Sequence, residues 1–291
     1  MLKLNGIIAA MTTPLTKEEK INEQELRNQV NRFIKAGIHS LFCLGTNGEF
    51  YALSFEEKLK VISIVVDETK GRVPVLAGTG CITTKETIEL TKKAKELGVD
   101  AVSVISPYFA GCSQEVLYNH FSTLADSVDI PIILYNIPAR TGVNIDYTTV
   151  VKLAKIKNII GVKDSSGNFD NVLRYIEETP EDFIVLSGND SLILWTLMAG
   201  GNGGISGISN ILPEIMVSIY EEWKKGDFKK SKKAQDSIRA IRDTLKWGNP
   251  NSIVKFATNL IGNPVGPAKA PFNVDSKEIE VKLLKVLELY K

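Results

Sequence analysis

A lysine in the middle of the chain stands where lysines are seldom found. Lys163 follows directly on the apolar part of IIGVKDSSG (159–167), which is typical of a buried strand. A lysine is almost never fully buried unless it is paired or has a chemical role. Desolvation lowers the pKa of a lysine, and the neutral amine can then attack a carbonyl carbon. The run therefore predicts either a Schiff-base nucleophile or a structural ion pair, with Asp164 or Glu49 as the partner.

Other reactive or carboxylate-binding residues follow similar apolar runs. Tyr135 comes near the end of PIILYNIP, where a phenol can move protons while an imine forms. GTNGEF (45–50) sets Thr46 and Asn47 between glycines, and successive backbone N–H groups in such a turn can bind a small carboxylate. Arg140 follows the Tyr135 run closely, and a guanidinium can fork onto a carboxylate. Each feature has a simpler alternative. Tyr135 could be an ordinary tyrosine at the barrel rim, residues 45–50 an ordinary glycine turn, and Arg140 part of a surface salt bridge.

These residues need a scaffold, and the chain repeats one pattern that can supply it. Short apolar runs end in Gly, Asn, Ser or Thr, and N-cap signals open several of the helical stretches between them, at Asn22, Ser54, Ser113 and Asn168. The runs are apolar on both faces, as parallel strands covered by helices must be. Eight such units, spaced by about 25 to 33 residues, predict a (β/α)8 barrel. The alternative is an open doubly wound sheet, but no G-x-G-x-x-G motif follows the first run. The eight runs begin at residues 6, 40, 73, 100, 131, 159, 183 and 203.

The end of the chain departs from this repeat. Residues 226–291 predict three further helices, over 227–247, 251–262 and 276–290. We therefore expect a catalytic barrel formed by residues 1–225 and a C-terminal helical extension packed on it. In a barrel of this kind the active site lies at the C-terminal ends of the strands, where Lys163, Tyr135 and Thr46 would meet.

Composition narrows the partners and the chemistry. Lys plus Arg number 35 against 34 Asp plus Glu, so no net field attracts nucleic acid or a membrane surface. No run approaches the ~18 apolar residues of a membrane helix. Three widely spaced cysteines and an N-terminus without a signal-type apolar segment indicate a reducing, cytoplasmic compartment. The two histidines lack metal-ligand spacing, so we expect no metal and no dissociable cofactor.

A glycine-rich run near the eighth strand allows a rival reading. GGNGGISG (200–207) could bind a phosphate, as loops after the last strands of barrels often do. We favour a tight turn where backbones pack closely in the barrel wall.

Several of these segments are also familiar as a set. GTNGEF, YNIPARTG and GVKDSSGN, with SGND and GGISG after them, resemble the pyruvate-dependent class I aldolase family, which includes dihydrodipicolinate synthases, N-acetylneuraminate lyases and 2-keto-3-deoxy sugar acid aldolases. The likeness runs from the first strand to the C-terminal helices. It implies a Schiff base on Lys163, acid–base chemistry by Tyr135 linked to Thr46, and a homotetramer or homodimer. It also implies a set of substrate-binding residues: Thr46, Asn47, Tyr108, Arg140, Gly188 and Ile205.

Two departures from the synthase pattern leave the second substrate open. Asn47 stands where a second threonine is usual, and Phe109 replaces the second tyrosine of the SPYF segment. A phenylalanine cannot pass a proton, so Tyr108 or a water would have to substitute. Arg140 favours condensation of pyruvate with aspartate semialdehyde. The departures favour a 2-keto-3-deoxy sugar acid aldolase or dehydratase, or an N-acetylneuraminate lyase-like aldolase, and a non-catalytic 2-oxo acid sensor is an alternative of another class.

Overall fold

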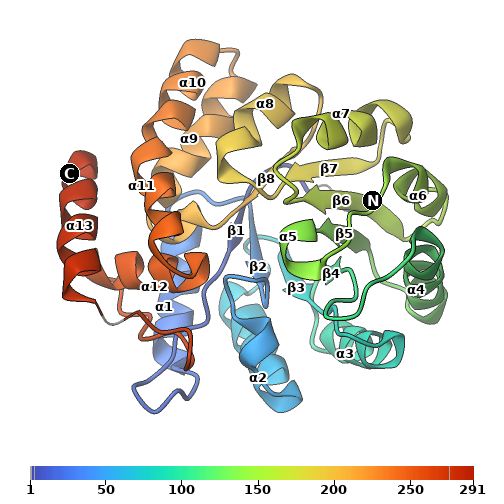
Figure 1. Cartoon of the computed structure of the whole chain (residues 1–291), viewed down its shortest axis with the longest axis horizontal. Helices are drawn as coiled ribbons and strands as arrows, with labels where there is room; N and C mark the ends of the chain where they lie inside the picture. The colour runs from blue at the N-terminus through green and yellow to red at the C-terminus, as the bar shows by residue number, and fades with distance from the viewer. Residues whose placement is uncertain (1, 3, 275) are drawn as a thin grey trace.

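Eight parallel strands close into a barrel in the order β1 to β8. The computed structural model describes residues 2, 4–274 and 276–291. Each strand pairs with the next, and β8 pairs with β1 through the register Gly6 to Gly203, so the sheet has no open edge (Figure 1). The predicted (β/α)8 barrel is confirmed and the open sheet is excluded. The strands are β1 (Gly6–Ala10), β2 (Ser40–Cys43), β3 (Val75–Gly78), β4 (Ala101–Ile105), β5 (Ile132–Asn136), β6 (Ile159–Asp164), β7 (Ile184–Ser187) and β8 (Gly203–Ser206).

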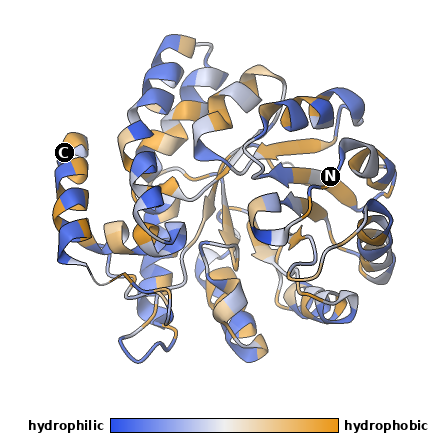
Figure 2. Cartoon of the chain, in the orientation of Figure 1, coloured by the Kyte–Doolittle hydropathy of each residue, from blue (hydrophilic) through white to orange (hydrophobic). Residues whose placement is uncertain are grey.

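Helices surround the barrel, and the predicted caps open them. Asn22, Ser113 and Asn168 each accept a hydrogen bond from a first-turn backbone N–H. Ser54 forms a full capping box with Glu57. Hydrophobic and hydrophilic residues alternate along these helices, as an inner and an outer face require (Figure 2). The helices are α1 (Glu23–Lys35), α2 (Phe55–Thr69), α3 (Thr84–Glu96), α4 (Gln114–Ser127), α5 (Pro138–Thr141), α6 (Tyr147–Leu153), α7 (Phe169–Glu178), α8 (Ile193–Met198) and α9 (Pro213–Lys224).

The interior of the barrel has its own apolar core. Alternate residues along the strands, such as Phe42 and Ile133, form a cluster separate from the larger one between strands and helices. Side chains two residues apart on a strand point to the same face. Tyr135 follows Ile133 by two residues, so it continues the inner set toward the C-terminal end of the barrel. Tyr135 also lies opposite Lys163 in the register of β5 and β6.

The C-terminal extension is helical, but its first helix is interrupted. The predicted helix over 227–247 is instead α10 (Phe228–Ser237), α11 (Arg239–Thr244) and the 3-10 turn η4 (Leu245–Trp247). The break has a physical cause, because the Tyr290 hydroxyl accepts from the N–H of Ile241 and donates to the carbonyl of Ser237. Those two groups would otherwise bond each other along one helix.

The rest of the extension lies beside the barrel. It continues as α12 (Pro250–Leu260) and α13 (Lys277–Leu287), drawn in orange to red in Figure 1. The Gln235 side chain joins α10 to the barrel by accepting from the N–H of Leu194 and donating to the carbonyl of Asp190. In the described residues no helix is long and apolar enough to cross a membrane. The short turns are η1 (Phe50–Ala52), η2 (Asp190–Leu192), η3 (Ile208–Asn210) and η5 (Glu288–Tyr290).

Candidate active site

Lys163 lies inside the mouth of the barrel among aromatic rings. Its side chain is buried, with 4% of the residue surface exposed. The Nζ atom is 3.9 Å from the ring centroid of Tyr135 and 5.2 Å from that of Phe42. Across the described chain this nitrogen has no ion pair and no hydrogen bond. A buried amine without a carboxylate partner is the arrangement that a nucleophile needs.

The two carboxylates that could have paired with Lys163 have other partners. Glu49 binds Lys255 Nζ at 2.6 Å. Asp164 accepts from the side-chain amides of Asn136 and Asn171, each at 2.8 Å. The ion-pair reading of Lys163 is therefore excluded.

Tyr135 and Thr46 form the pair that the resemblance implied. The Tyr135 hydroxyl and the Thr46 hydroxyl are 3.1 Å apart, within hydrogen-bonding distance. Tyr135 is buried, and its ring faces Lys163. A phenol held in this way beside an amine can pass protons to and from groups bound at that amine.

Thr46 belongs to a tight turn with two residues in left-handed conformation. Leu44 (φ 57°) and Glu49 (φ 55°) both adopt positive φ although neither is glycine. Such residues cost about 1–3 kcal/mol each and persist where the surroundings hold them. The turn is closed by hydrogen bonds from the Gly48 N–H to Gly45 and from the Glu49 N–H to Thr46. The side chain of Thr13 adds a third, to the Gly48 carbonyl at 2.7 Å.

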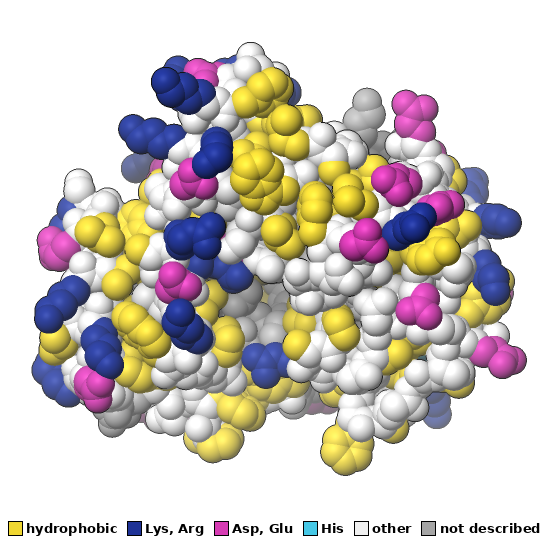
Figure 3. All heavy atoms as spheres, turned by 45° about the horizontal axis from the view of Figure 1, so that its top comes forward, with side chains coloured by type: hydrophobic (Ala, Val, Ile, Leu, Met, Phe, Trp, Pro, Cys, Tyr) yellow, Lys and Arg dark blue, Asp and Glu magenta, His cyan; other side chains and the backbone are white. Residues whose placement is uncertain are grey.

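The predicted substrate-binding residues other than Tyr108 line one cavity. Its volume is about 280 Å³, and Gly188 and Ile205 form part of its wall. Gly188 cannot be replaced without a shift, because a Cβ there would lie 2.8 Å from Lys163 Cε. The face drawn in Figure 3 is hollowed near its centre, and basic and acidic side chains are interspersed around it. The predicted residues that line this cavity are Thr46, Asn47, Tyr135, Arg140, Lys163, Gly188 and Ile205.

A second cavity adjoins the first and contains Tyr108. Its volume is about 230 Å³, and it shares Thr46, Arg140 and Asn251 with the first. Burial raises the pKa of the half-buried Tyr108 phenol. Phe109, by contrast, is 97% exposed and contributes to neither cavity.

Several residues of the site come from the extension, and sequence reasoning missed them. Asn251 lines both cavities, Phe272 lines the second, and Arg242 lines the first. Arg242 donates to the side chains of Asn189 at 2.8 Å and Ser191 at 3.2 Å. Arg140 is thus one of two guanidinium groups at the mouth. No local motif marks these positions, because they follow the last strand by more than thirty residues.

Other predicted features have structural roles. The glycine-rich loop packs closely, since a Cβ at Gly203 would lie 2.0 Å from the Gly6 carbonyl and one at Gly204 2.5 Å from Ile193. This favours the tight-turn reading over a phosphate site.

The described residues contain no cluster of three His, Cys, Asp or Glu side chains able to hold a metal ion. Burial raises the pKa of Cys43 to about 12, and the cysteines are free thiols: Cys43, Cys81 and Cys112.

The fold and the site together define a class of enzyme, and comparison with known proteins identifies the family. A buried lysine with no ion pair in the described chain, beside a tyrosine and a threonine at the C-terminal end of a (β/α)8 barrel, is the arrangement expected of a lyase that works through a lysine imine. Residues 3–289 match the model of the dihydrodipicolinate synthetase family, and the chain belongs to that family.

Relatives of this chain agree with the assignment. It is 43% identical to a 4-hydroxy-tetrahydrodipicolinate synthase of Methanopyrus kandleri, over 99% of this chain and 97% of the relative. A crystal structure of a dihydrodipicolinate synthase from Bacillus anthracis superposes with a TM-score of 0.96 at 36% identity, covering 99% of both chains. A prophage protein of the same family from E. coli K12, solved in complex with pyruvate, superposes with a TM-score of 0.94 at 32% identity over 99% of each chain. The chain is a lyase or synthase of this family.

Proposed function

We propose that the enzyme joins pyruvate to aspartate semialdehyde through an imine on Lys163. The unpaired, buried Lys163 amine beside Tyr135 carries this proposal. Nζ attacks C2 of pyruvate, and the carbonyl oxygen leaves as water once Tyr135 has supplied a proton. The protonated imine then draws electrons from C3, whose proton passes to the Tyr135 phenolate as the enamine forms. C3 of the enamine attacks the aldehyde carbon, and Tyr135 returns the proton to the new alkoxide. Hydrolysis of the imine then frees the product and the Lys163 amine, and the proton released restores the Tyr135 phenol.

The turn that carries Thr46 is suited to hold the pyruvate carboxylate. Within the described chain the backbone N–H groups of Thr46 and Asn47 have no hydrogen-bond acceptor, and both residues line the cavity with Lys163. Backbone N–H groups in a turn bind carboxylates well because they are already oriented. With the carboxylate there, C2 lies toward Lys163 and the carbonyl oxygen toward Tyr135.

The adjoining cavity is suited to the second substrate. It is lined by Arg140, an exposed guanidinium on α5, and it shares Thr46 with the first cavity as a lining residue. A second carboxylate bound by Arg140 would leave the aldehyde end of aspartate semialdehyde near the enamine. The Methanopyrus kandleri relative is a 4-hydroxy-tetrahydrodipicolinate synthase, which supports the same choice of substrate.

A 2-keto-3-deoxy sugar acid aldolase is the second candidate. Phe109 favours it, because the exposed phenyl group offers no hydroxyl to a proton relay in the site. Tyr108 lies at the cavity wall and can supply a hydroxyl in its place, so we rank the synthase first.

Trapping the imine tests the chemistry. Borohydride added with pyruvate should fix a three-carbon adduct, and peptide mapping should place it on the GVKD peptide. An adduct on another lysine, or none, contradicts the mechanism, and reversible pyruvate binding without an adduct indicates a sensor. Turnover is then measured with pyruvate and either aspartate semialdehyde or glyceraldehyde. Turnover with glyceraldehyde alone contradicts the synthase.

We also propose a homotetramer or homodimer in the cytoplasm. Three apolar side chains lie exposed on neighbouring helices, Trp195 and Met198 on α8 and Phe228 on α10, and contact with a second copy would cover them. The free thiols fit a reducing compartment. Sedimentation equilibrium gives the subunit number, and a monomer at micromolar concentration contradicts the oligomer.

A further inference from the structure

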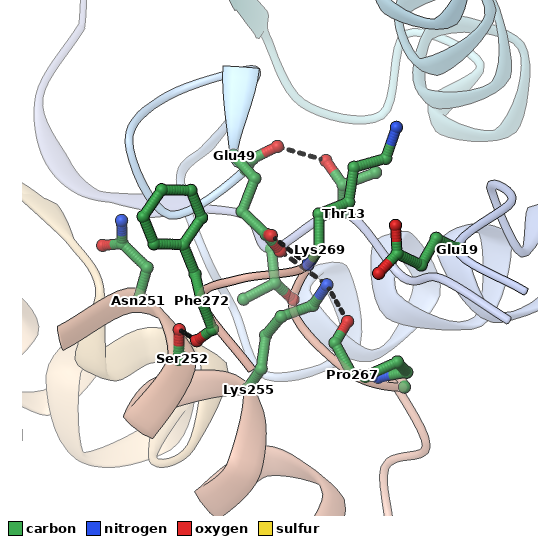
Figure 4. Close-up of polar contacts among 12 residues, drawn as sticks. Thr13, Glu19, Glu49, Asn251, Ser252, Lys255, Pro267, Lys269 and Phe272 are labelled. Carbon is green, nitrogen blue, oxygen red and sulfur yellow. Dashed lines mark hydrogen bonds and ion pairs between the residues drawn. The ribbon is translucent and has the colours of Figure 1, made fainter. Parts of the chain in front are cut away.

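Glu49 ends the Thr46 turn with a carboxylate that is almost completely buried. It is 1% exposed. One oxygen accepts from Lys255 Nζ at 2.6 Å, and the other accepts from the backbone N–H of Lys269 at 2.8 Å (Figure 4). Lys255 Nζ also donates to the carbonyl of Pro267 at 2.7 Å. Both oxygens of the carboxylate are therefore bound, and Lys255 is its counter-ion.

This carboxylate acts on the site through the turn. Glu49 lines neither cavity, so it does not touch a substrate bound there. Its backbone N–H donates to the Thr46 carbonyl at 3.1 Å, which closes the turn that presents the Thr46 hydroxyl to Tyr135. Its own left-handed conformation is one that a glutamate seldom adopts unless the surroundings hold it.

The partners of Glu49 belong to the part of the extension that forms the cavity wall. Lys255 lies on α12 one turn after Asn251, which lines both cavities. The side chain of Ser252 bonds the carbonyl of Phe272, which lines the second cavity. The buried pair thus joins the turn on the barrel to the wall supplied by the extension (Figure 4).

We propose that Glu49 is a positioning residue for imine formation, held by Lys255 and the Lys269 backbone. The pair fixes the turn so that the Thr46 hydroxyl stays on Tyr135 and the N–H groups of Thr46 and Asn47 face the cavity. The inference rests on the proposed function, because it assigns Glu49 to the binding of pyruvate. A purely structural pair would stabilise the fold and leave the affinity for pyruvate unchanged.

Two variants separate these possibilities. Glu49→Gln keeps the size of the side chain but turns one of its two acceptors into a donor, facing a group that also donates. Lys255→Met keeps the carboxylate and removes its counter-ion. Leu153→Ala, in the buried face of α6, is the control for a loss of stability remote from the turn. For each protein the yield of borohydride adduct is measured against pyruvate concentration, at a temperature where circular dichroism shows it fully folded.

The expected result is a shift in half-saturation rather than in yield. Glu49→Gln and Lys255→Met should need at least about tenfold more pyruvate for half-maximal trapping, with a smaller loss at saturation. Leu153→Ala should unfold at lower temperature and keep the wild-type half-saturation. If a folded variant of the pair traps pyruvate with the wild-type concentration dependence, the inference is wrong. If only one of the two variants folds, its pyruvate concentration for half-maximal trapping tests the inference alone. Failure of the wild type itself to form an adduct instead contradicts the proposed function.

Discussion

Among the residues that the structure describes, two lysines are buried, and their surroundings are opposite. Lys163 is 4% exposed and Lys255 is 1% exposed, so burial does not distinguish them. Lys163 faces the rings of Tyr135 and Phe42, whereas Lys255 faces the carboxylate of Glu49. Burial lowers the pKa of Lys255, and Glu49 opposes that shift. If Lys163 is the nucleophile that we propose, the partner of a buried lysine, rather than its depth, distinguishes a reactive amine from a cation held in an ion pair.

The same substitution at both lysines should give opposite results, and the larger is expected at Lys163. Lys163→Met removes the amine that forms the imine, so we expect turnover to fall by about 10⁴-fold or more. Stability should stay close to wild type, because the lost amine had no ion pair and methionine fills a similar volume. Steady-state turnover and thermal unfolding measure the two effects. A variant that kept a tenth of the activity would remove Lys163 from the mechanism.

Lys255→Met should reverse that pattern. Removing one partner of a buried ion pair leaves the other charge uncompensated and costs about 3–5 kcal/mol of unfolding free energy. Turnover at saturating pyruvate should fall far less than in Lys163→Met. Denaturant unfolding at pH 7 gives the stability. A matched exposed pair, Lys282 with Glu278, provides the control, since Lys282→Met should change the unfolding free energy by less than about 1 kcal/mol. Equal effects of the two substitutions would break the distinction between buried and exposed pairs.

A substitution at Tyr135 tests whether its hydroxyl or its aromatic ring matters for the chemistry that we propose at Lys163. Tyr135→Phe keeps the aromatic ring beside Nζ and removes the hydroxyl that bonds Thr46. If the hydroxyl moves protons, the rate of imine formation should fall by about 10²- to 10⁴-fold. If the ring alone matters, by excluding water from the amine, the rate should be almost unchanged. Single-turnover trapping with pyruvate measures it, and Tyr118→Phe, on the partly buried face of α4, is the control for loss of a phenol.

The Lys163 region could be predicted from the sequence, and the Lys255 region could not. Parallel strands in a barrel bring their C-terminal ends together, so the positions of Lys163, Tyr135 and Thr46 followed from strand order alone. Glu49 and Lys255 are separated by 206 positions along the chain. Their pairing depends on how α12 docks on the barrel, which hydrophobic periodicity does not specify. From the sequence, Asp164 and Glu49 were both possible ion-pair partners for Lys163.

The break between α10 and α11 at Ile238 could not be predicted from the sequence either, because it also depends on a contact between residues far apart in the chain. No glycine or proline stands there, and the helix is broken by a hydroxyl from Tyr290, at the far end of the chain. Local patterns therefore predicted which residues gather at the candidate site and missed the long-range contacts made by the extension.

His120 is a buried base like the two lysines, and we expect it to have the smallest effect of the residues compared, a change in how the unfolding free energy depends on pH. Its imidazole is 4% exposed and bonds the Thr84 hydroxyl at 2.9 Å, and burial lowers its pKa to about 4. The unfolded chain has an ordinary histidine pKa of about 6.5. Between these values the unfolded chain binds a proton that the folded chain does not, so the unfolding free energy should fall as pH falls from 6.5 to 4. The loss from this residue should reach at most about 3 kcal/mol near pH 4, with no contribution above pH 7.

Removing the imidazole isolates this effect from the titration of carboxylates. His120→Gln keeps a polar group near Thr84 and does not titrate, so its unfolding free energy should decline less steeply between pH 6.5 and 4 than that of the wild type. Denaturant unfolding at pH 7, 5.5 and 4.5 measures both slopes. His39→Gln is the control for replacing a histidine elsewhere in the molecule, where the imidazole lies 2.9 Å from the Glu221 carboxylate. Parallel slopes for His120→Gln and wild type would show that this buried base gains its proton in the folded state as readily as in water. The presence or absence of a carboxylate partner would then account for the two buried lysines but not for His120.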